Sequence, residues 1–172
     1  MKRYFLLALI AGSGLTACKS GGKQEASAAQ SGDSTATVTT VAQTDTAKVY
    51  NAYLSVKDNL VKTDSKGAQQ SAKALAANLS NIKGCTEAAD LATRIAATDD
   101  VKSQRNIFLL LSQDVIPLVK GMKTKSGPVY VAYCPMAGNG KGGYWLSAQK
   151  EIKNPYYGDE MLECGEVKEE IK

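Results

Sequence analysis

Two short motifs near the C-terminus of the chain combine sulfur-bearing side chains. Cys134-Pro135-Met136 places a thiol and a thioether two residues apart, and Met161-Leu-Glu-Cys164 places the same pair three residues apart. Soft thiolate and thioether ligands select Cu(I), and the chemically similar Ag(I), over zinc, calcium or magnesium. If the fold brings the motifs together, we expect Cys134, Met136, Met161 and Cys164 to form a metal site for one of these ions.

The same residues support a second interpretation. In an oxidising compartment Cys134 and Cys164 would form a disulfide, which closes a loop of about 30 residues and adds roughly 3 kcal/mol of stability in the chain-entropy view. Met136 and Met161 would then fill gaps in the core. Cys85 makes an odd number with these two cysteines. It is a free thiol, a third metal ligand or the disulfide partner of either other cysteine.

Composition excludes several other functions. The chain contains no histidine, so it lacks the commonest general base, every Ser-His-Asp or Cys-His arrangement and any histidine-ligated zinc, iron or Cu(II) site. We therefore expect no enzymatic activity. A net charge of +4 over 172 residues is too weak for a nucleic-acid binder, which needs a concentrated basic face. The glycine-rich stretch 138–143 lacks the Ser or Thr and the helix of a phosphate loop, so we interpret it as a turn.

The N-terminal residues predict export and lipidation. Lys2-Arg3 precedes an apolar stretch, residues 4–11, and Leu15-Thr-Ala-Cys18 resembles the lipoprotein box of bacteria closely. Residues 1–17 are thus expected to be a signal peptide, and lipidation of Cys18 would anchor the mature protein in a membrane. The localisation that follows is the bacterial cell envelope, lipid-anchored and periplasm-facing, with the choice of membrane and leaflet left open.

Two further segments follow Cys18. Residues 18–44 are rich in Ser, Thr, Ala, Gly and Gln and contain no aromatic residue, so a flexible tether is expected there. Residues 45–125 and 126–172 are expected to form one domain. The first part is helical, and the second is a cap rich in Cys, Met and Tyr that packs on it.

Apolar residues at helical spacing predict four helices within 45–125. The first spans about 46–63, the second follows a cap at Asp64-Ser65, Thr86 caps the third, and Asp99-Asp100 opens the fourth. Pro117 predicts a kink or an early end near Ile116. Short connections favour antiparallel neighbours, so the predicted fold class is mainly α, an antiparallel four-helix bundle with a small C-terminal β/loop cap.

The cap contains the remaining sequence signals. Residues 128–134 alternate as a strand does, and 144–146 form a returning strand after the turn. Tyr144, Trp145, Tyr156 and Tyr157 would either form a contact surface or cover the cap where it packs on the helices. The acidic residues Asp159, Glu160, Glu163 and Glu166 are interpreted as a solvated face that also attracts an incoming cation.

Several motifs resemble those of one bacterial envelope protein family. They are Tyr133-Cys-Pro-Met-Ala, Trp145-Leu-Ser, Glu151-Ile-Lys-Asn-Pro-Tyr-Tyr-Gly158 and Met161-Leu-Glu-Cys-Gly165, with Val49 to Asp58 upstream. The family is catalogued as a domain of unknown function, also found attached to copper/silver efflux adaptor (membrane-fusion) proteins, and the resemblance covers roughly 46–168. It implies a helical periplasmic domain in heavy-metal handling, with efflux components as partners.

These observations predict a membrane-anchored lipoprotein that binds Cu(I) or Ag(I) without catalysis, in copper handling or efflux. The resemblance implies that Cys134, Met136, Met161 and Cys164 hold the metal, since they match the motif positions of the family. The alternative is a structural or protein-interaction module in which Cys134 and Cys164 form a disulfide.

Overall fold

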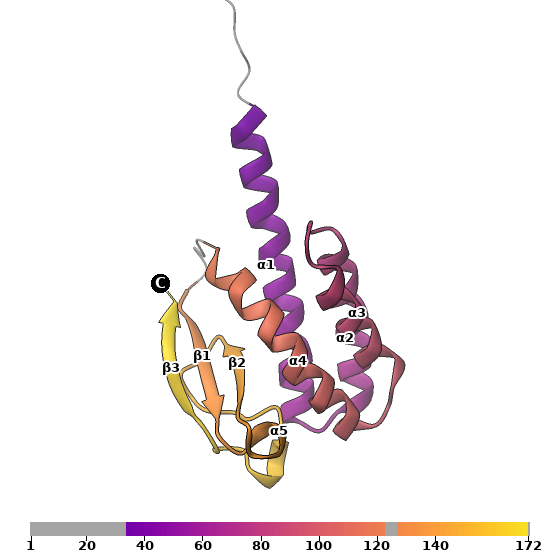
Figure 1. Ribbon diagram of the computed structural model, residues 1–172, viewed down its shortest axis with the longest axis vertical. Coiled ribbons are helices and arrows are strands. Elements are labelled where there is room, and N and C mark those ends of the chain that lie inside the picture. Colours follow the sequence, from indigo (N-terminus) through magenta and orange to yellow (C-terminus); the bar gives the residue numbers. More distant parts are fainter. Residues whose placement is uncertain (1–33, 123–126, 172) are drawn as a thin grey trace, which may run out of the picture. The chain divides into compact units, whose positions relative to one another are not determined.

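Four long helices precede a small sheet in the computed structural model, which describes residues 34–122 and 127–171, with side chains from Asp45 onward (Figure 1). The helices are α1 (Ser34–Val61), α2 (Ser65–Ser80), α3 (Thr86–Ala97) and α4 (Val101–Lys120). After them come β1 (Val129–Cys134), α5 (Ala137–Gly140), β2 (Gly143–Ser147), the 3-10 helix η1 (Gly158–Glu160) and β3 (Glu166–Ile171). This order confirms a mainly helical fold with a small C-terminal sheet. The signal peptide and Cys18 lie outside the described residues.

The apolar stripes predicted for the first two helices are buried. Val49, Tyr53, Val56 and Leu60 of α1 have no exposed surface, and neither have Ala68, Ala72, Leu75 and Leu79 of α2. The predicted N-caps of α2 and α4 are also present. The carboxylates of Asp64 and Asp100 accept hydrogen bonds from backbone N–H groups in the first turns of these helices. For α3 the predicted cap is wrong by one residue, since Cys85 occupies the N-cap position and Thr86 is the first helical residue.

Two helix ends differ from the predictions. α1 begins at Ser34, so the last part of the predicted tether, 34–44, is helical. This stretch contains neither glycine nor proline, and extending a helix that packing has already nucleated costs little per residue. α4 continues through Pro117 to Lys120. Of the two alternatives predicted near Ile116, the early end is therefore wrong, and the kink stays a prediction. A proline in the last turn removes only one hydrogen bond of the helix.

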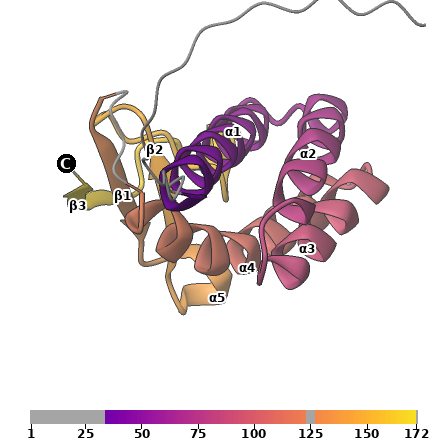
Figure 2. The same ribbon diagram turned by 90° about the horizontal axis from the view of Figure 1, so that it is seen from above.

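The helices share a core with the sheet. α2 packs against α1 and α3, and α4 packs against α3, α1 and β2. In two perpendicular views α2 and α3 lie on one side of α1 and α4, and the sheet lies on the other (Figures 1 and 2). The antiparallel arrangement of a four-helix bundle stays a prediction. None of the described helices has the length and apolarity needed to cross a bilayer.

The sheet has the strand order β2-β1-β3, and both strand pairs are antiparallel. The hairpin of β1 and β2 confirms the predicted strands. The sequence did not reveal β3, because its residues EVKEEI are mostly charged and exposed, as is common for a strand at the edge of a sheet.

Buried aromatic residues connect the sheet to the helices. The hydroxyl of Tyr53 on α1 accepts a hydrogen bond from the N–H of Leu146 on β2 (3.2 Å) and lies 2.7 Å from Ser112 Oγ on α4. The Tyr156 ring packs between Trp145 and Phe108. The cap is therefore part of the same packed core as the helices.

Candidate sulfur site

The fold brings the two predicted thiols into contact. Cys134 ends β1 and is fully buried, whereas Cys164 lies in the turn before β3 and is partly exposed. Their Sγ atoms are 2.9 Å apart, and both cysteines are free thiols. A disulfide bond is about 2.05 Å long, so the pair is close enough to be oxidised with a small displacement of either side chain.

A buried asparagine fixes the turn that carries Cys164. Asn154 is fully buried, and its Nδ2 donates to the carbonyl oxygen of Cys164 (2.8 Å). Its backbone N–H donates to the carbonyl oxygen of Leu162 (2.8 Å), and its Oδ1 accepts from the N–H of Tyr156 (2.8 Å). An Asn-Pro pair in a sequence gives no sign that the asparagine side chain reaches forward to position a cysteine.

Glycine is required immediately after Cys164. Gly165 has a φ of 146°, and a Cβ built on it would lie 2.8 Å from the carbonyl oxygen of Tyr133 and 2.9 Å from the ring of Trp145. Any larger residue would push the turn away from β1. The absence of a side chain at this position thus lets the two cysteines approach each other.

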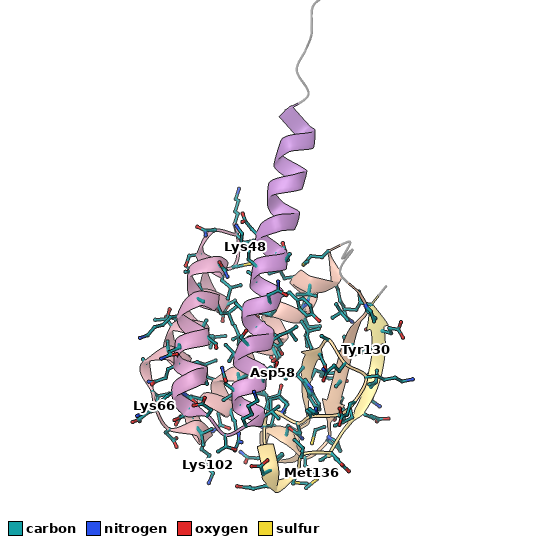
Figure 3. All side chains as sticks on the ribbon, turned by 180° about the vertical axis from the view of Figure 1, so that it is seen from behind. Lys48, Asp58, Lys66, Lys102, Tyr130 and Met136 are labelled. Atoms are coloured by element: carbon teal, nitrogen blue, oxygen red, sulfur yellow. The ribbon has the colours of Figure 1, made fainter. Side chains whose placement is uncertain are left out.

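The predicted methionine ligands differ in their surroundings. Met136 lies just after β1, with half of its surface (50%) exposed, at the end of the cap where β1 finishes (Figure 3). Its backbone N–H donates to the Cys164 thiol, and its carbonyl oxygen accepts a hydrogen bond from Tyr157 Oη (2.6 Å). Met161 is partly buried, and its carbonyl oxygen accepts from the N–H of Cys164 (3.1 Å). The structure therefore connects both methionines to the cysteine pair through their backbones.

The pKa of Cys164 reflects these contacts. The hydrogen bond with Cys134 raises the pKa of the Cys164 thiol above its ordinary value, burial raises it further, and the N–H of Met136 opposes both. Burial also raises the pKa of Tyr157, with a smaller contribution from the two cysteines. The four acidic residues of the segment, Asp159, Glu160, Glu163 and Glu166, are all exposed, which agrees with a solvated negative face.

The third cysteine lies apart from this pair. Cys85 is a free thiol at the start of α3 and lines a hollow of about 240 Å³ together with helical residues, among them Asp114 and Pro117. Burial, followed by the charge of Asp114, raises the pKa of its thiol. Cys85 is thus not bonded to either of the other two cysteines in the structure, and its role as a third metal ligand stays a prediction.

A buried arginine was not anticipated from the sequence. Arg105 on α4 donates from Nε to the carbonyl oxygen of Pro155 (3.1 Å) and from Nη2 to that of Leu60 (3.0 Å). It joins α1, α4 and the loop that leads to Cys164. Arg105 stands between Gln104 and Asn106 in the sequence, and this polar stretch contains no signal for the role.

The aromatic residues of the cap divide between the core and the surface. Trp145 and Tyr156 are buried, so they belong to the core, whereas Tyr144 is 47% exposed. The Met161–Cys164 segment is a turn after η1 and not part of a longer helix. Among residues 34–122 and 127–171, no three His, Cys, Asp or Glu side chains lie together as a metal cluster.

Comparison with known proteins gives one family. Residues 49–127 match the model of a family described as Protein of unknown function (DUF3347). No curated protein and no solved structure matches the chain. The matched range runs from α1 through α4 and ends before β1. It therefore supports a domain of unknown function in the helical part, and the sulfur motifs lie beyond it.

Proposed function

We propose that this protein is a lipid-anchored envelope protein in which an antiparallel four-helix bundle carries a site for one Cu(I) or Ag(I) ion in its C-terminal cap. The observation that carries the proposal is the contact between Cys134 and Cys164, two thiols from motifs 30 residues apart. Two thiolates without any nitrogen ligand suit a soft monovalent ion. No catalytic group is needed, so the role is binding, in copper handling or efflux.

The geometry indicates how an ion would enter. Thiolate–metal bonds of about 2.3 Å, the length known for zinc, place two sulfurs roughly 3.8 Å apart in a tetrahedral site and about 4.6 Å apart in a linear one. The present separation of 2.9 Å must therefore increase by about 1–2 Å. Cys134 is held in the sheet opposite Gly143, so we expect the turn with Cys164 to move.

The surroundings favour a cation at this position. The exposed carboxylates near Cys164 give the segment a negative potential, which attracts a monovalent cation. Met136 is half exposed and next to the pair, so its thioether can reach an ion on the solvent side. In this proposal the anchor at Cys18 keeps the site at a membrane, where copper or silver efflux components would receive the ion.

Anaerobic titration of the reduced full-length protein with Ag(I) tests the proposal, with native mass spectrometry as the readout. We expect one ion per chain, lost in Cys134→Ser and in Cys164→Ser and retained in Cys85→Ser, the matched control. Met136→Leu and Met161→Leu should weaken binding without abolishing it. Unchanged stoichiometry and affinity in both Cys134→Ser and Cys164→Ser would contradict the proposal.

A second candidate is a protein-interaction module with a Cys134–Cys164 disulfide. The short sulfur separation favours it, since a disulfide needs a smaller displacement than a metal ion does. The outer face of the sheet supplies a contact surface. The rings of Tyr133 and Tyr144 lie 4.6 Å apart, and Lys168 Nζ lies 5.6 Å from the Tyr133 ring centre. Protein that stays metal-free, with a disulfide that resists mild reduction, would favour this candidate.

A further inference from the structure

The two sulfurs of the pair differ in their access to solvent. Cys134 is fully buried, and Cys164 is partly exposed in a surface turn, yet their Sγ atoms are only 2.9 Å apart. A bond that serves only as a cross-link needs no such difference. We propose that the pair exchanges electrons with a disulfide of a partner polypeptide, with Cys164 as the attacking thiol and Cys134 as the resolving thiol.

The exchange proceeds in two balanced steps. The Cys164 sulfur, having lost its proton to solvent, attacks one sulfur of the partner disulfide. The partner S–S bond breaks, a mixed disulfide forms at Cys164, and the other partner sulfur leaves as a thiolate that takes up a proton. The deprotonated Cys134 sulfur then attacks Cys164 Sγ and releases the second partner thiolate. Two electrons have passed to the partner, and the protein holds a Cys134–Cys164 disulfide.

The local structure supports each step. The partly exposed turn lets an incoming disulfide reach Cys164, whereas the burial of Cys134 keeps external disulfides away from it. The second attack needs no large rearrangement, because Asn154 and Gly165 already hold the Cys164 turn against β1.

This inference does not depend on metal binding, so its test uses the reduced, metal-free, full-length protein. The probe is oxidised glutathione, a small peptide disulfide. Samples are quenched with acid at intervals, and peptide mapping by mass spectrometry assigns the adducts. In the unaltered protein we expect an internal Cys134–Cys164 disulfide and two released glutathione thiols for each pair oxidised. An excess of reduced glutathione should reverse the reaction.

Single variants separate the two roles. In Cys134→Ser we expect the mixed disulfide to accumulate at Cys164, because the resolving thiol is missing. In Cys164→Ser we expect the glutathione adduct at Cys134 to form at least tenfold more slowly, since only the buried thiol remains. Cys85→Ser is the control and should behave as the unaltered protein does.

Two results would overturn the inference. One is a mixed disulfide that forms no faster at Cys164 than at the partly buried Cys85. The other is an internal disulfide that an excess of reduced glutathione leaves intact, which would make it a cross-link only. In Cys134→Ser and Cys164→Ser the alkylation rate of Cys85 reports whether the helical core is still folded, so misfolding is recognised separately. Neither result bears on the Ag(I) titration, which uses no oxidant.

Discussion

Asn154 is the residue through which the position of Cys164 can be tested most directly. Its side chain is fully buried and makes two hydrogen bonds, one to the carbonyl oxygen of Cys164 and one from the N–H of Tyr156, both 2.8 Å long. Asn154→Ala removes the side-chain donor and the side-chain acceptor of these two hydrogen bonds and adds no bulk. We expect this variant to loosen the turn and to lower the stability of the cap.

The two lost hydrogen bonds set the size of the effect. The N–H of Tyr156 belongs to a buried residue, and leaving such a group unpaired costs about 1–3 kcal/mol. The carbonyl of Cys164 belongs to a partly exposed residue. Water can replace the Asn154 amide as the donor to this carbonyl, so the loss of stability is closer to the net contribution of one hydrogen bond, about 1 kcal/mol. The free energy of unfolding should therefore fall by about 2–4 kcal/mol.

Urea unfolding of the reduced full-length protein provides the assay. Trp145 is the only tryptophan and is buried in the cap, so its fluorescence reports the cap, while circular dichroism reports the helices. With a urea dependence of about 2 kcal/mol per M, the middle of the usual range for small proteins, the midpoint should fall by about 1–2 M. Asn51→Ala, on the exposed surface of α1, should change the stability by less than about 0.5 kcal/mol.

The result tests both the role of the Asn154 side chain and the cooperativity of the cap with the helices. A change in Asn154→Ala as small as that in Asn51→Ala would refute the view that this side chain holds the turn. If the fluorescence transition moves and the circular dichroism transition does not, the cap unfolds separately. In that case the aromatic contacts between sheet and helices do not make one cooperative unit.

Three further perturbations test other parts of the structure. Gly165→Ala should destabilise the protein by about 2–4 kcal/mol in thermal or urea unfolding, because a new Cβ would lie 2.8 Å from a backbone oxygen. The control is Gly140→Ala, at a position with φ 82° and open space around it, which should cost only about 1 kcal/mol in the same assay. Tyr53→Phe should cost about 1–3 kcal/mol in the same assay, since the N–H of Leu146 loses its buried partner. The Cys164 thiol has a raised pKa and must lose its proton to bind a metal. The apparent Ag(I) affinity should therefore rise with pH below that pKa, by up to about tenfold per pH unit for each proton displaced. A flat pH profile in competition titrations would contradict thiolate ligation.

The sequence predicted the helical part well because its signals are local. The spacing of Val49, Tyr53, Val56 and Leu60 follows the helical period, and all four side chains are buried. Asp64 precedes α2 and caps it. The start of α1 was less predictable, since residues 34–44 have a composition that suits either a helix or a tether.

The two cysteines could be singled out from the sequence, but the groups that bring them together could not. Cys134 and Cys164 stand out by residue type, and the structure brings them together. The groups that position them were not evident. Asn154 acts through a contact across ten residues of chain, and Arg105 acts across 50. Such roles depend on how loops fold back, which the periodicity of a sequence does not contain.

The late position of Cys164 in the chain has a consequence for biosynthesis. Chains are made from the N-terminus, so Cys85 and Cys134 both exist before Cys164 and β3 are made. In an oxidising compartment an early bond between them would join α3 to β1, a pairing that is absent from the folded protein. Correct closure of the cap must therefore wait until Cys164 and β3 have been made, and any premature Cys85–Cys134 bond must first be reshuffled, a slow reaction that disulfide isomerases accelerate.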